Sequence, residues 1–385
     1  MPENLSYVKL RASYASVGVA FERFIANPKY SWNSSGLSWN TQTQYPMYDL
    51  KPERTESLEV GLTLRFLKHF NMDVTYYRSN TRNQTFSPQI SIGSGYSDIY
   101  IQSGNVRNQG VELALGYSNT WGKFSWDSNY TLSVNKNKII SLANNVYNPV
   151  SGEYFDISLL DMNGLGQAHF ILKEGGTLGD LYSMIDIKRE YNGRIFIDRD
   201  GSIPTETIQD VDKYIKLGSV LPDANMAWRN DFRIGNFNIG FLVSARIGGV
   251  VFSRTQAMLD YYGVSEASAA ARDAGGIVIN GGDRIDSQTW YRAVAGGTSV
   301  PQYYTYSATN VRLQEAYVGY TVPKKVLKNV CEINISLVGR NLWMIYNKAP
   351  FDPESIATTG NYYQGIDYFM MPSLRNIGFN VRLKF

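Results

Sequence analysis

Hydrophobic and polar residues alternate along much of the chain with a period of two, which is the period of a β-strand. The C-terminal stretch shows this most plainly: its odd positions from Ile377 to Phe385 are apolar, and its even positions from Gly378 to Lys384 are polar or glycine. Similar alternation predicts about twelve strands, at residues 5–17, 58–66, 72–77, 111–118, 124–135, 169–173, 178–188, 225–234, 237–247, 311–321, 331–343 and 377–385.

The links between consecutive predicted strands are alternately short and long. The short links lie near residues 68–70, 119–122, 175–177, 235–236 and 322–330, and the long ones cover 18–52, 87–104, 141–167, 189–224, 248–308 and 344–372. Gly235-Asn236 is a two-residue signal for a tight antiparallel hairpin. Short turns at one end and long loops at the other are typical of a transmembrane antiparallel β-barrel, whereas a soluble sandwich or propeller has no reason to sort its loops in this way.

The residues between the apolar positions of the strands are strongly polar. Strand 124–135 carries an almost wholly polar row, which would be costly in a dry core, where each unpaired group loses its water. We therefore predict one face toward a watery lumen and the other toward lipid. The predicted lumen-facing residues are Glu59, Arg65, Glu112, Asp127, Asn129 and Arg382; the predicted lipid-facing residues are Leu62, Leu113, Leu132, Phe241 and Phe379.

Two local features refine this prediction. Alternation breaks at Glu315-Ala316, which predicts a β-bulge or a register change there. Aromatic residues gather near strand ends, as an interfacial girdle of a barrel requires; they are Phe70, Trp121, Phe124, Trp126, Trp228 and Trp343.

Composition narrows the class of protein. The chain has 385 residues, of which 43% are hydrophobic and 18% charged, and a net charge of +3, which is too mild to indicate nucleic-acid binding. A single cysteine, Cys331, allows no internal disulfide. No apolar run of about 18 residues encodes a transmembrane helix. Met1 leads into a strand without a basic and then an apolar segment, so we expect no signal peptide within these residues.

Candidate chemistry is sparse, and we predict no catalytic residue, no metal site and no cofactor. His69 and His169 lie far apart in the sequence, and no Gly-x-Ser-x-Gly motif is present. The segment 198–202 resembles the middle of a calcium loop, but Phe196 and Thr207 stand where that loop needs acids, so an ordinary turn is the better interpretation. The acids of Asp352-Pro353-Glu354 have the chemistry to contact a cation, but an Asp-Pro turn is the default.

Aromatic residues cluster in the long loops. Exposed aromatic faces suit sugar rings or peptide side chains, so these residues are candidate substrate contacts. The alternative is that they pack loops together or meet a partner protein. The candidates are Tyr261, Tyr262, Trp290, Tyr291, Tyr303, Tyr304, Tyr306, Tyr362, Tyr363 and Tyr368.

Several motifs, spread over the chain in order, resemble the SusC/RagA-like family of TonB-linked outer-membrane transporters. One is Asn310-Val311-Arg312-Leu313, followed by Gly319 to Lys324. Another is Gly339-Arg340-Asn341-Leu342, followed by Phe351-Asp352-Pro353-Glu354. The remaining motifs are residues 5–14, 50–62, 104–113 and the terminal strand.

This resemblance implies a barrel of about 22 strands around an N-terminal plug, of which residues 1–385 are the C-terminal part, without the plug or a signal peptide. It implies an outer-membrane importer of large nutrients, oligosaccharides or peptides. The implied partners are a SusD-like lipoprotein lid, the TonB complex acting through the plug, outer-membrane lipid, and the barrel assembly machinery, which would read Phe385. Two rivals stay open: a self-contained outer-membrane channel or passive porin, and an outer-membrane enzyme with a Ser/His or Asp/His set at one rim.

Overall fold

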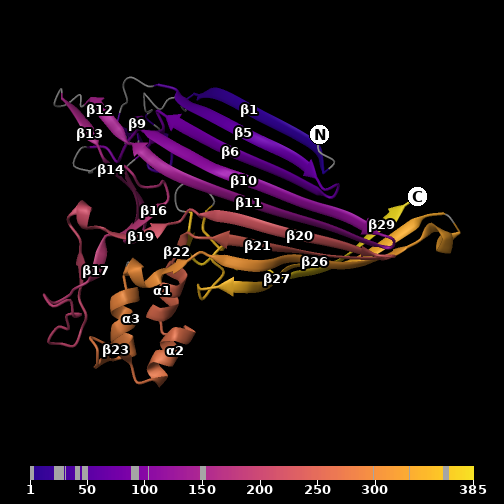
Figure 1. Ribbon diagram of the computed structural model, residues 1–385. Helices are drawn as coiled ribbons and strands as arrows, with labels where there is room; N and C mark the ends of the chain where they lie inside the picture. Colours follow the sequence, from indigo (N-terminus) through magenta and orange to yellow (C-terminus); the bar gives the residue numbers. More distant parts are fainter. Residues whose placement is uncertain are drawn as a thin grey trace.

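A curved, ten-stranded antiparallel sheet dominates the structure (Figure 1). This computed structural model describes residues 4–20, 30, 32–39, 44–45, 51–87, 95–102, 104–147, 153–297, 299–328, 330–358 and 364–385. The strands of the sheet, in their order across it, are β1 (Leu5–Val19), β5 (Glu53–Phe66), β6 (Phe70–Arg82), β10 (Asn105–Trp121), β11 (Phe124–Ser141), β20 (Ala224–Ile234), β21 (Phe237–Ile247), β26 (Asn310–Val322), β27 (Glu332–Asn347) and β29 (Asn376–Lys384).

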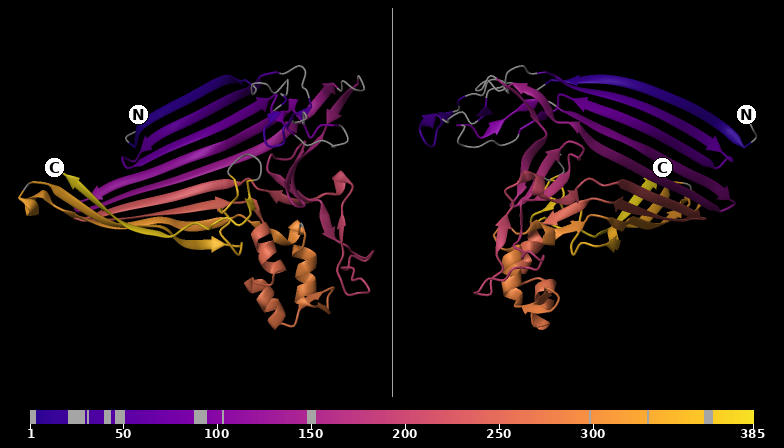
Figure 2. Two further views of the ribbon diagram at one scale, coloured as in Figure 1. Left: turned by 180° about the vertical axis from the view of Figure 1, so that it is seen from behind. Right: turned by 60° about the vertical axis from the view of Figure 1, so that its left-hand side comes forward.

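The sheet is an up-and-down meander, because each of its strands pairs with the next sheet strand along the chain. Figure 2 shows it as an open trough with β1 and β29 at its two edges and both chain termini at the same end. The links at that end are short: three are tight turns at residues 67–69, 122–123 and 235–236, and the fourth covers 323–331 and includes a 3-10 helix at Lys324–Leu327. At the other end the connections are long, as the alternation of link lengths predicts.

The pairing register separates the polar from the apolar residues. One row across five strands contains Leu10, Leu62, Val74, Leu113 and Leu132, and we call its side the apolar face. The neighbouring row defines the polar face and contains Arg11, Gly61, Thr75, Glu112 and Ser133. All six residues predicted to face a lumen lie on the polar face, and all five predicted to face lipid lie on the apolar face.

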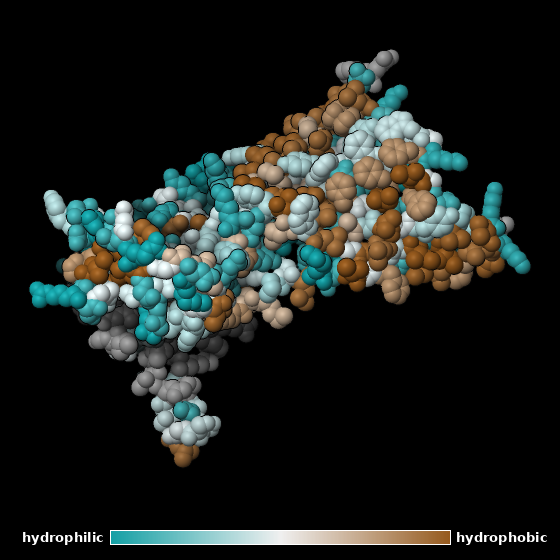
Figure 3. Space-filling model, turned by 90° about the horizontal axis from the view of Figure 1, so that it is seen from below, coloured by the Kyte–Doolittle hydropathy of each residue, from teal (hydrophilic) through white to brown (hydrophobic). Residues whose placement is uncertain are grey.

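The apolar face is not covered by the rest of the described chain. Leu10 is 74% exposed and Phe379 is 82% exposed, and water-soluble monomers rarely expose large contiguous apolar patches. Figure 3 shows hydrophobic side chains gathered over the strands, whereas the long-loop end is mainly hydrophilic. No helix among the described residues is long and apolar enough to cross a bilayer.

Two of the predicted strands lie outside the large sheet, which corrects their assignment. Residues 169–173 fall in β15 (Ala168–Lys173), and residues 178–188 divide into β16 (Asp180–Ser183) and β17 (Ile185–Ile187). Together with β14 (Leu159–Leu165) and β19 (Ile215–Ser219), β15 and β16 form a four-stranded sheet. The reason is that Phe170, Ile171 and Leu172 are all buried, so β15 has no polar row to place against water.

The predicted irregularity in strand 311–321 is confirmed, one residue earlier than expected. The pairing of β26 shifts register between Leu313 and Glu315 on both sides, which leaves Gln314 outside the ladder. The bulge keeps Glu315 and Arg312 on the same face, although they are three positions apart in the sequence.

The hydrophobic core lies at the long-loop end, not in the sheet. We call residues 153–223, 248–297, 299–308 and 364–372 the loop module. Its larger core contains Phe170, Leu181, Val220, Phe252 and Tyr304, all at most 2% exposed. A smaller core around Phe86, Val106, Ile139, Leu142, Leu160 and Leu172 joins the module to the ends of the strands.

The insert 248–308 contains helices that the sequence reading treats as loop. Among the described residues these are α1 (Arg254–Tyr261), α2 (Glu266–Asp273) and α3 (Ser287–Ala295), which lie beyond the long-loop end of the sheet (Figure 1). Each begins at a side-chain cap, from Ser253, Ser265 and Asp286 respectively.

Short ladders complete the loop end. They are β2 (Trp32–Asn33), β3 (Ser38–Trp39), β4 (Gln44–Tyr45), β7 (Thr85–Phe86), β8 (Asp98–Ile99), β9 (Ile101–Gln102), β12 (Ala143–Tyr147), β13 (Tyr154–Ile157), β18 (Thr205–Thr207), β22 (Val250–Ser253), β23 (Ile277–Ile279), β24 (Asp283–Ile285), β25 (Thr305–Ser307) and β28 (Ile366–Asp367).

Candidate functional site

The polar face carries fixed ion pairs between neighbouring strands. The guanidinium of Arg11 on β1 binds both carboxylate oxygens of Asp73 on β6, at 2.6 and 2.7 Å. Thr63, on the intervening strand β5, donates to the same carboxylate at 2.7 Å. Gly61 makes room for this arrangement, because a Cβ at that position would collide with the guanidinium of Arg11. Both charged side chains remain partly exposed, at 40% and 38%, so the pair lies at a wetted surface.

A second polar cluster lies nearer the tight turns. The carboxylate of Asp231 accepts hydrogen bonds from Arg229 at 2.8 Å and from the hydroxyl of Tyr317 at 2.7 Å. Gly240 provides the space that the Tyr317 ring occupies. Two predicted lumen residues are register partners of this cluster, since Asn129 is opposite Arg229 and Asp127 is opposite Asp231. The polar face therefore carries two hydrogen-bonded clusters whose charged side chains remain partly exposed.

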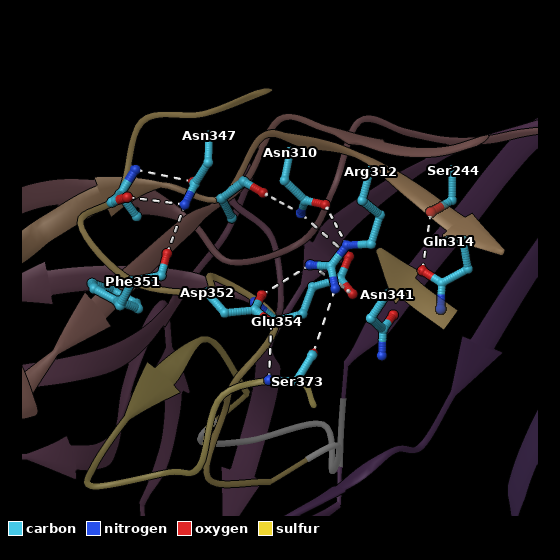
Figure 4. A network of polar contacts seen from close by, with 12 residues as sticks. Ser244, Asn310, Arg312, Gln314, Asn341, Asn347, Phe351, Asp352, Glu354 and Ser373 are labelled. Carbon is cyan, nitrogen blue, oxygen red and sulfur yellow. Dashed lines mark hydrogen bonds and ion pairs between the residues drawn. The ribbon is translucent and has the colours of Figure 1, made fainter. Parts of the chain in front are cut away.

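A buried ion pair closes the long-loop end of the polar face (Figure 4). Arg312 on β26 is 4% exposed, and its guanidinium lies 2.9 Å from Asp352 and 3.3 Å from Glu354. Asn310 accepts from the Arg312 Nε at 3.2 Å and donates to Glu354 at 3.2 Å. The backbone N–H of Ser373 donates to Asp352 at 3.3 Å. A buried charge is stable only with such partners, so this network fastens the connection between β27 and β29 against the sheet.

The charge of Asp352 is set by opposing effects. Burial raises the pKa of Asp352, but hydrogen bonds from Ser373, the backbone N–H of Glu354 and Arg312, together with the Arg312 charge, outweigh it and hold the pKa below its usual value. Both acids of the Asp352-Pro353-Glu354 turn are thus engaged by Arg312. No cluster of residues suited to a metal occurs in the part of the chain that the structure describes.

The other residues weighed for chemistry have structural partners. The backbone carbonyl oxygen of Asp198 accepts from the N–H of Gly201 at 2.9 Å, and the carboxylate of Asp200 accepts from the N–H of Ser202 at 2.9 Å, as in an ordinary turn. His69 lies at a tight turn, with its Nδ1 3.0 Å from the carbonyl oxygen of Ser118. His169 lies in the loop module with its Nδ1 2.8 Å from Asp161, so the two histidines are not brought together.

The aromatic candidates divide into two groups. Tyr304 is 2% exposed in the larger core, and Trp290, Tyr291, Tyr303 and Tyr306 pack against that core. These five rings therefore take part in packing the loops, and their role as substrate contacts stays a prediction.

The remaining candidates are at the surface or outside the described residues. Tyr261, Tyr262 and Tyr368 are exposed, at 37%, 68% and 51%. Tyr362 and Tyr363 lie outside the described residues. The three exposed rings stay as predicted contacts for substrate or partner.

An aromatic belt runs over the apolar face near the tight turns. Ring contacts continue from Phe70 to Tyr117 at 4.8 Å, from Tyr117 to Trp126 at 5.0 Å, and from Trp126 to Phe232 at 6.2 Å. Trp121 and Phe124 stack at 5.7 Å in the same belt. Phe385, the predicted assembly signal, is 82% exposed beyond β29.

Sequence reasoning did not find the two ion pairs, Arg11–Asp73 and Arg312–Asp352. Their partners are 62 and 40 residues apart, so no local pattern joins them. Arg312 and Asp352 do belong to two of the motifs that carry the family resemblance. The structure shows that these two motifs meet in one network.

Comparison with known proteins agrees with this geometry. The family described as TonB dependent receptor-like, beta-barrel, matches residues 4–342. TonB-dependent receptor P3 of Formosa agariphila is 24% identical over 371 residues, which cover 89% of this chain and 35% of that protein. TonB-dependent receptor P26 of the same organism is 23% identical and is matched over 100% of this chain and 40% of its own length.

Among solved structures, the RagAB peptide transporter shares the fold with a TM-score of 0.71 at 16% identity. That match covers 100% of this chain and 42% of the other chain. The RagAB peptide importer in its closed-closed state gives a TM-score of 0.72 at 15% identity, again over 42% of that chain. The present chain thus spans about two fifths of the length of these proteins.

Proposed function

The chain belongs to the family of TonB-dependent receptor β-barrels, which are outer-membrane proteins, and we propose that it forms part of the wall and the outer loops of an importer for large nutrients. In this role the apolar face contacts lipid, and the polar face lines the passage, including Glu59, Arg65, Glu112, Asp127, Asn129 and Arg382. No bond chemistry is needed. The proposed role of these residues is to line a hydrated passage through the membrane.

The observation that carries the proposal is the two-faced sheet. Its apolar face is exposed and bordered by an aromatic belt, and its polar face holds hydrogen-bonded ion pairs in contact with water. Only a wall between lipid and water satisfies both faces at once.

The edges of the sheet favour a larger barrel over a self-contained channel. Among the described residues, β1 pairs in the sheet only with β5, and β29 only with β27. Unpaired backbone groups at such edges are costly in lipid, so closure calls for further strands. We propose that these ten strands are the C-terminal part of a barrel of about 22 strands, the number that the family resemblance implies.

The loop module supports large cargo and a surface partner. It is packed around its own core and presents Tyr261, Tyr262 and Tyr368 outward. We propose that it lies on the extracellular side, beneath a lipoprotein lid of the SusD kind, and that TonB acts through a plug outside these residues. Peptides are the favoured cargo because the structural matches are named as peptide transporters, with oligosaccharides as the second class.

Uptake in cells tests this function. Cells that produce the receptor are given fluorescently labelled oligopeptides or oligosaccharides of several lengths, with TonB either present or deleted. We expect uptake of one class, and its loss without TonB. Uptake that continues without TonB, together with ion conductance of the purified protein in planar bilayers, would instead identify a passive channel.

A further inference from the structure

A groove of about 540 Å³ lies among the three helices of the loop module. This volume is within the usual range of small-ligand sites. The C-terminal end of α1, the body of α2 and the N-terminal end of α3 form its walls. Its side chains include Asp260, Tyr261, Tyr262, Arg272, Asp286 and Tyr291.

The most informative residue of the groove is Asp260, in the last turn of α1. Its side chain is only 5% exposed, and one carboxylate oxygen accepts from Gln256 at 2.9 Å. Among the described residues, no lysine, arginine or histidine forms an ion pair with it. Two other buried charges do have ionic partners: Asp180 lies 2.5 Å from Lys216, and Arg312 is held by two acids. Asp367, at 4% exposed, is another acid without an ion pair among the described residues, but it accepts from the hydroxyl of Ser253 at 2.6 Å and does not line the groove. Asp260 is thus a buried acid without an ionic partner that lines the groove.

A buried carboxylate without a cation is electrostatically unfavourable, and its position adds to this. The C-terminal end of a helix carries partial negative charge from unpaired carbonyl groups, which repels an anion and attracts a cation. The negative charge reaches neighbouring side chains: burial raises the pKa of Tyr306 to about 12, and the charge of Asp260 contributes to that rise. Burial and then Asp260 also raise the pKa of Tyr291, which lines the groove.

The groove also has the aromatic surface that suits an organic cation. The rings of Tyr261 and Tyr262 meet edge to face at 5.1 Å, and Tyr262 is 68% exposed. The faces of such rings attract an ammonium group within about 6 Å. A metal ion suits the groove less well, because hard cations require about six or more oxygen ligands and no metal-binding cluster occurs among the described residues.

We propose that this groove binds a primary ammonium group, with Asp260 as its carboxylate partner and Tyr261 and Tyr262 beside it. Arg272 lines the same groove, and its guanidinium is held by the carbonyl oxygen of Gly263 at 2.8 Å. A groove that carries both an acid and a guanidinium fits a ligand with an ammonium and a nearby carbonyl or carboxylate group. The N-terminus of a peptide has this chemistry, and an amino sugar is a second source of the ammonium.

Binding to the protein purified from outer membranes tests the proposal independently of transport. Isothermal titration compares trialanine, N-acetyl-trialanine, glucosamine and glucose. We expect the free amine to bind roughly tenfold or more tightly than its acetylated form, because acetylation removes the charge that Asp260 pairs with. Stronger binding of glucosamine than of trialanine would support the site and identify an amino sugar as the ligand.

Two variants locate the site. Asp260→Asn keeps the shape and the hydrogen bond from Gln256 but removes the charge, so it should lower the affinity for the amine at least tenfold. The matched control is Asp273→Asn, an exposed acid of α2 that does not line the groove, and it should leave the affinity unchanged. Tyr262→Ala should weaken binding by about threefold.

Several outcomes would overturn the proposal. They are equal affinity for the free and acetylated peptides, no binding of either amine, or an Asp260→Asn variant that gains thermal stability and binds as before. The last result would show that Asp260 serves only the internal packing of the module. If the protein imports labelled substrate in a TonB-dependent way but binds no amine, the amine-binding proposal fails and the proposed function stands.

Discussion

The large sheet and the loop module use the same kinds of side chain in opposite ways. Phe379 in β29 is 82% exposed, whereas Phe170 in β15 is completely buried. Arg11 on the polar face is partly exposed beside Asp73, whereas Arg312, at the long-loop end of that face, is buried and paired with Asp352 and Glu354. The loop module is built like a water-soluble domain, with its apolar residues inside. The sheet has no interior of its own, so its stability depends on lipid on one side and water on the other.

Mutations should therefore act differently in the two regions. In the loop module, stability depends on packing and on paired buried charges. In the sheet, it depends on which solvent a side chain meets.

Removing the buried guanidinium of Arg312 should have the largest effect on stability. Arg312→Ala leaves the acids of Asp352 and Glu354 without their cation, and breaking a buried pair in this way costs about 3–5 kcal/mol. We expect the connection between β27 and β29 to become sensitive to protease while the sheet stays folded. The control is Arg340→Ala, because Arg340 is 67% exposed and its pair with Glu315 should contribute about 1 kcal/mol or less. Equal protease sensitivity in both variants would contradict the account.

A charge on the apolar face should have the next largest effect. Leu132→Arg should lower the free energy of unfolding by about 2–4 kcal/mol if the side chain lies near the bilayer midplane. Asn129→Arg, on the polar face of the same strand, should be nearly neutral. Folding titrations into lipid bilayers measure both. Equal losses would show that the two faces do not meet different solvents.

Protonation of His169 should have a smaller effect, confined to the loop module. Burial lowers the pKa of His169, but the hydrogen bond and charge of Asp161 and the Gly166 carbonyl raise it more, so the net pKa lies above its usual value. A raised pKa in the folded state means that the contribution is complete below the unfolded pKa of about 6.5. It is lost as the pH rises through the folded pKa.

The module should therefore be slightly more stable at pH 6 than at pH 8, as measured by thermal unfolding. His169→Gln should reduce this pH dependence, whereas His69→Gln, which removes the other histidine, should keep it. An unchanged pH dependence in the His169→Gln variant would refute the role of the Asp161 pair.

Much of the sheet is predictable from sequence because its two solvents impose a strict alternation. The ten strands of the sheet each carry that pattern, and the tight turns identify their neighbours. The pattern fails at β15, where both sides are buried and the alternation disappears. Even the bulge in β26 follows from a break in the pattern, since β26 changes register between Leu313 and Glu315.

The loop module is less predictable because its contacts join distant segments. Some of its local signals are readable: Ser253 caps α1 through the backbone N–H of Gln256, a Ser-x-x-Gln capping pattern. The alanine-rich α2 ends before Gly275-Gly276, which is also a helix-end signal. The partners of Arg312 and the burial of Tyr304, in contrast, depend on how the loops fold over one another. No spacing in the sequence encodes those contacts.

The central claim, that the apolar face meets lipid and the polar face meets water, is tested most directly by fluorescence quenching. A fluorophore is attached to Leu113→Cys or Glu112→Cys, which are adjacent on β10, in a background where the free Cys331 is replaced by serine. The proteins are inserted into bilayers that contain brominated lipids, and iodide is then added from the water. We predict that lipid bromine quenches the probe at residue 113 and that iodide quenches the probe at residue 112. The opposite result, or equal quenching of both probes by both agents, would contradict the account.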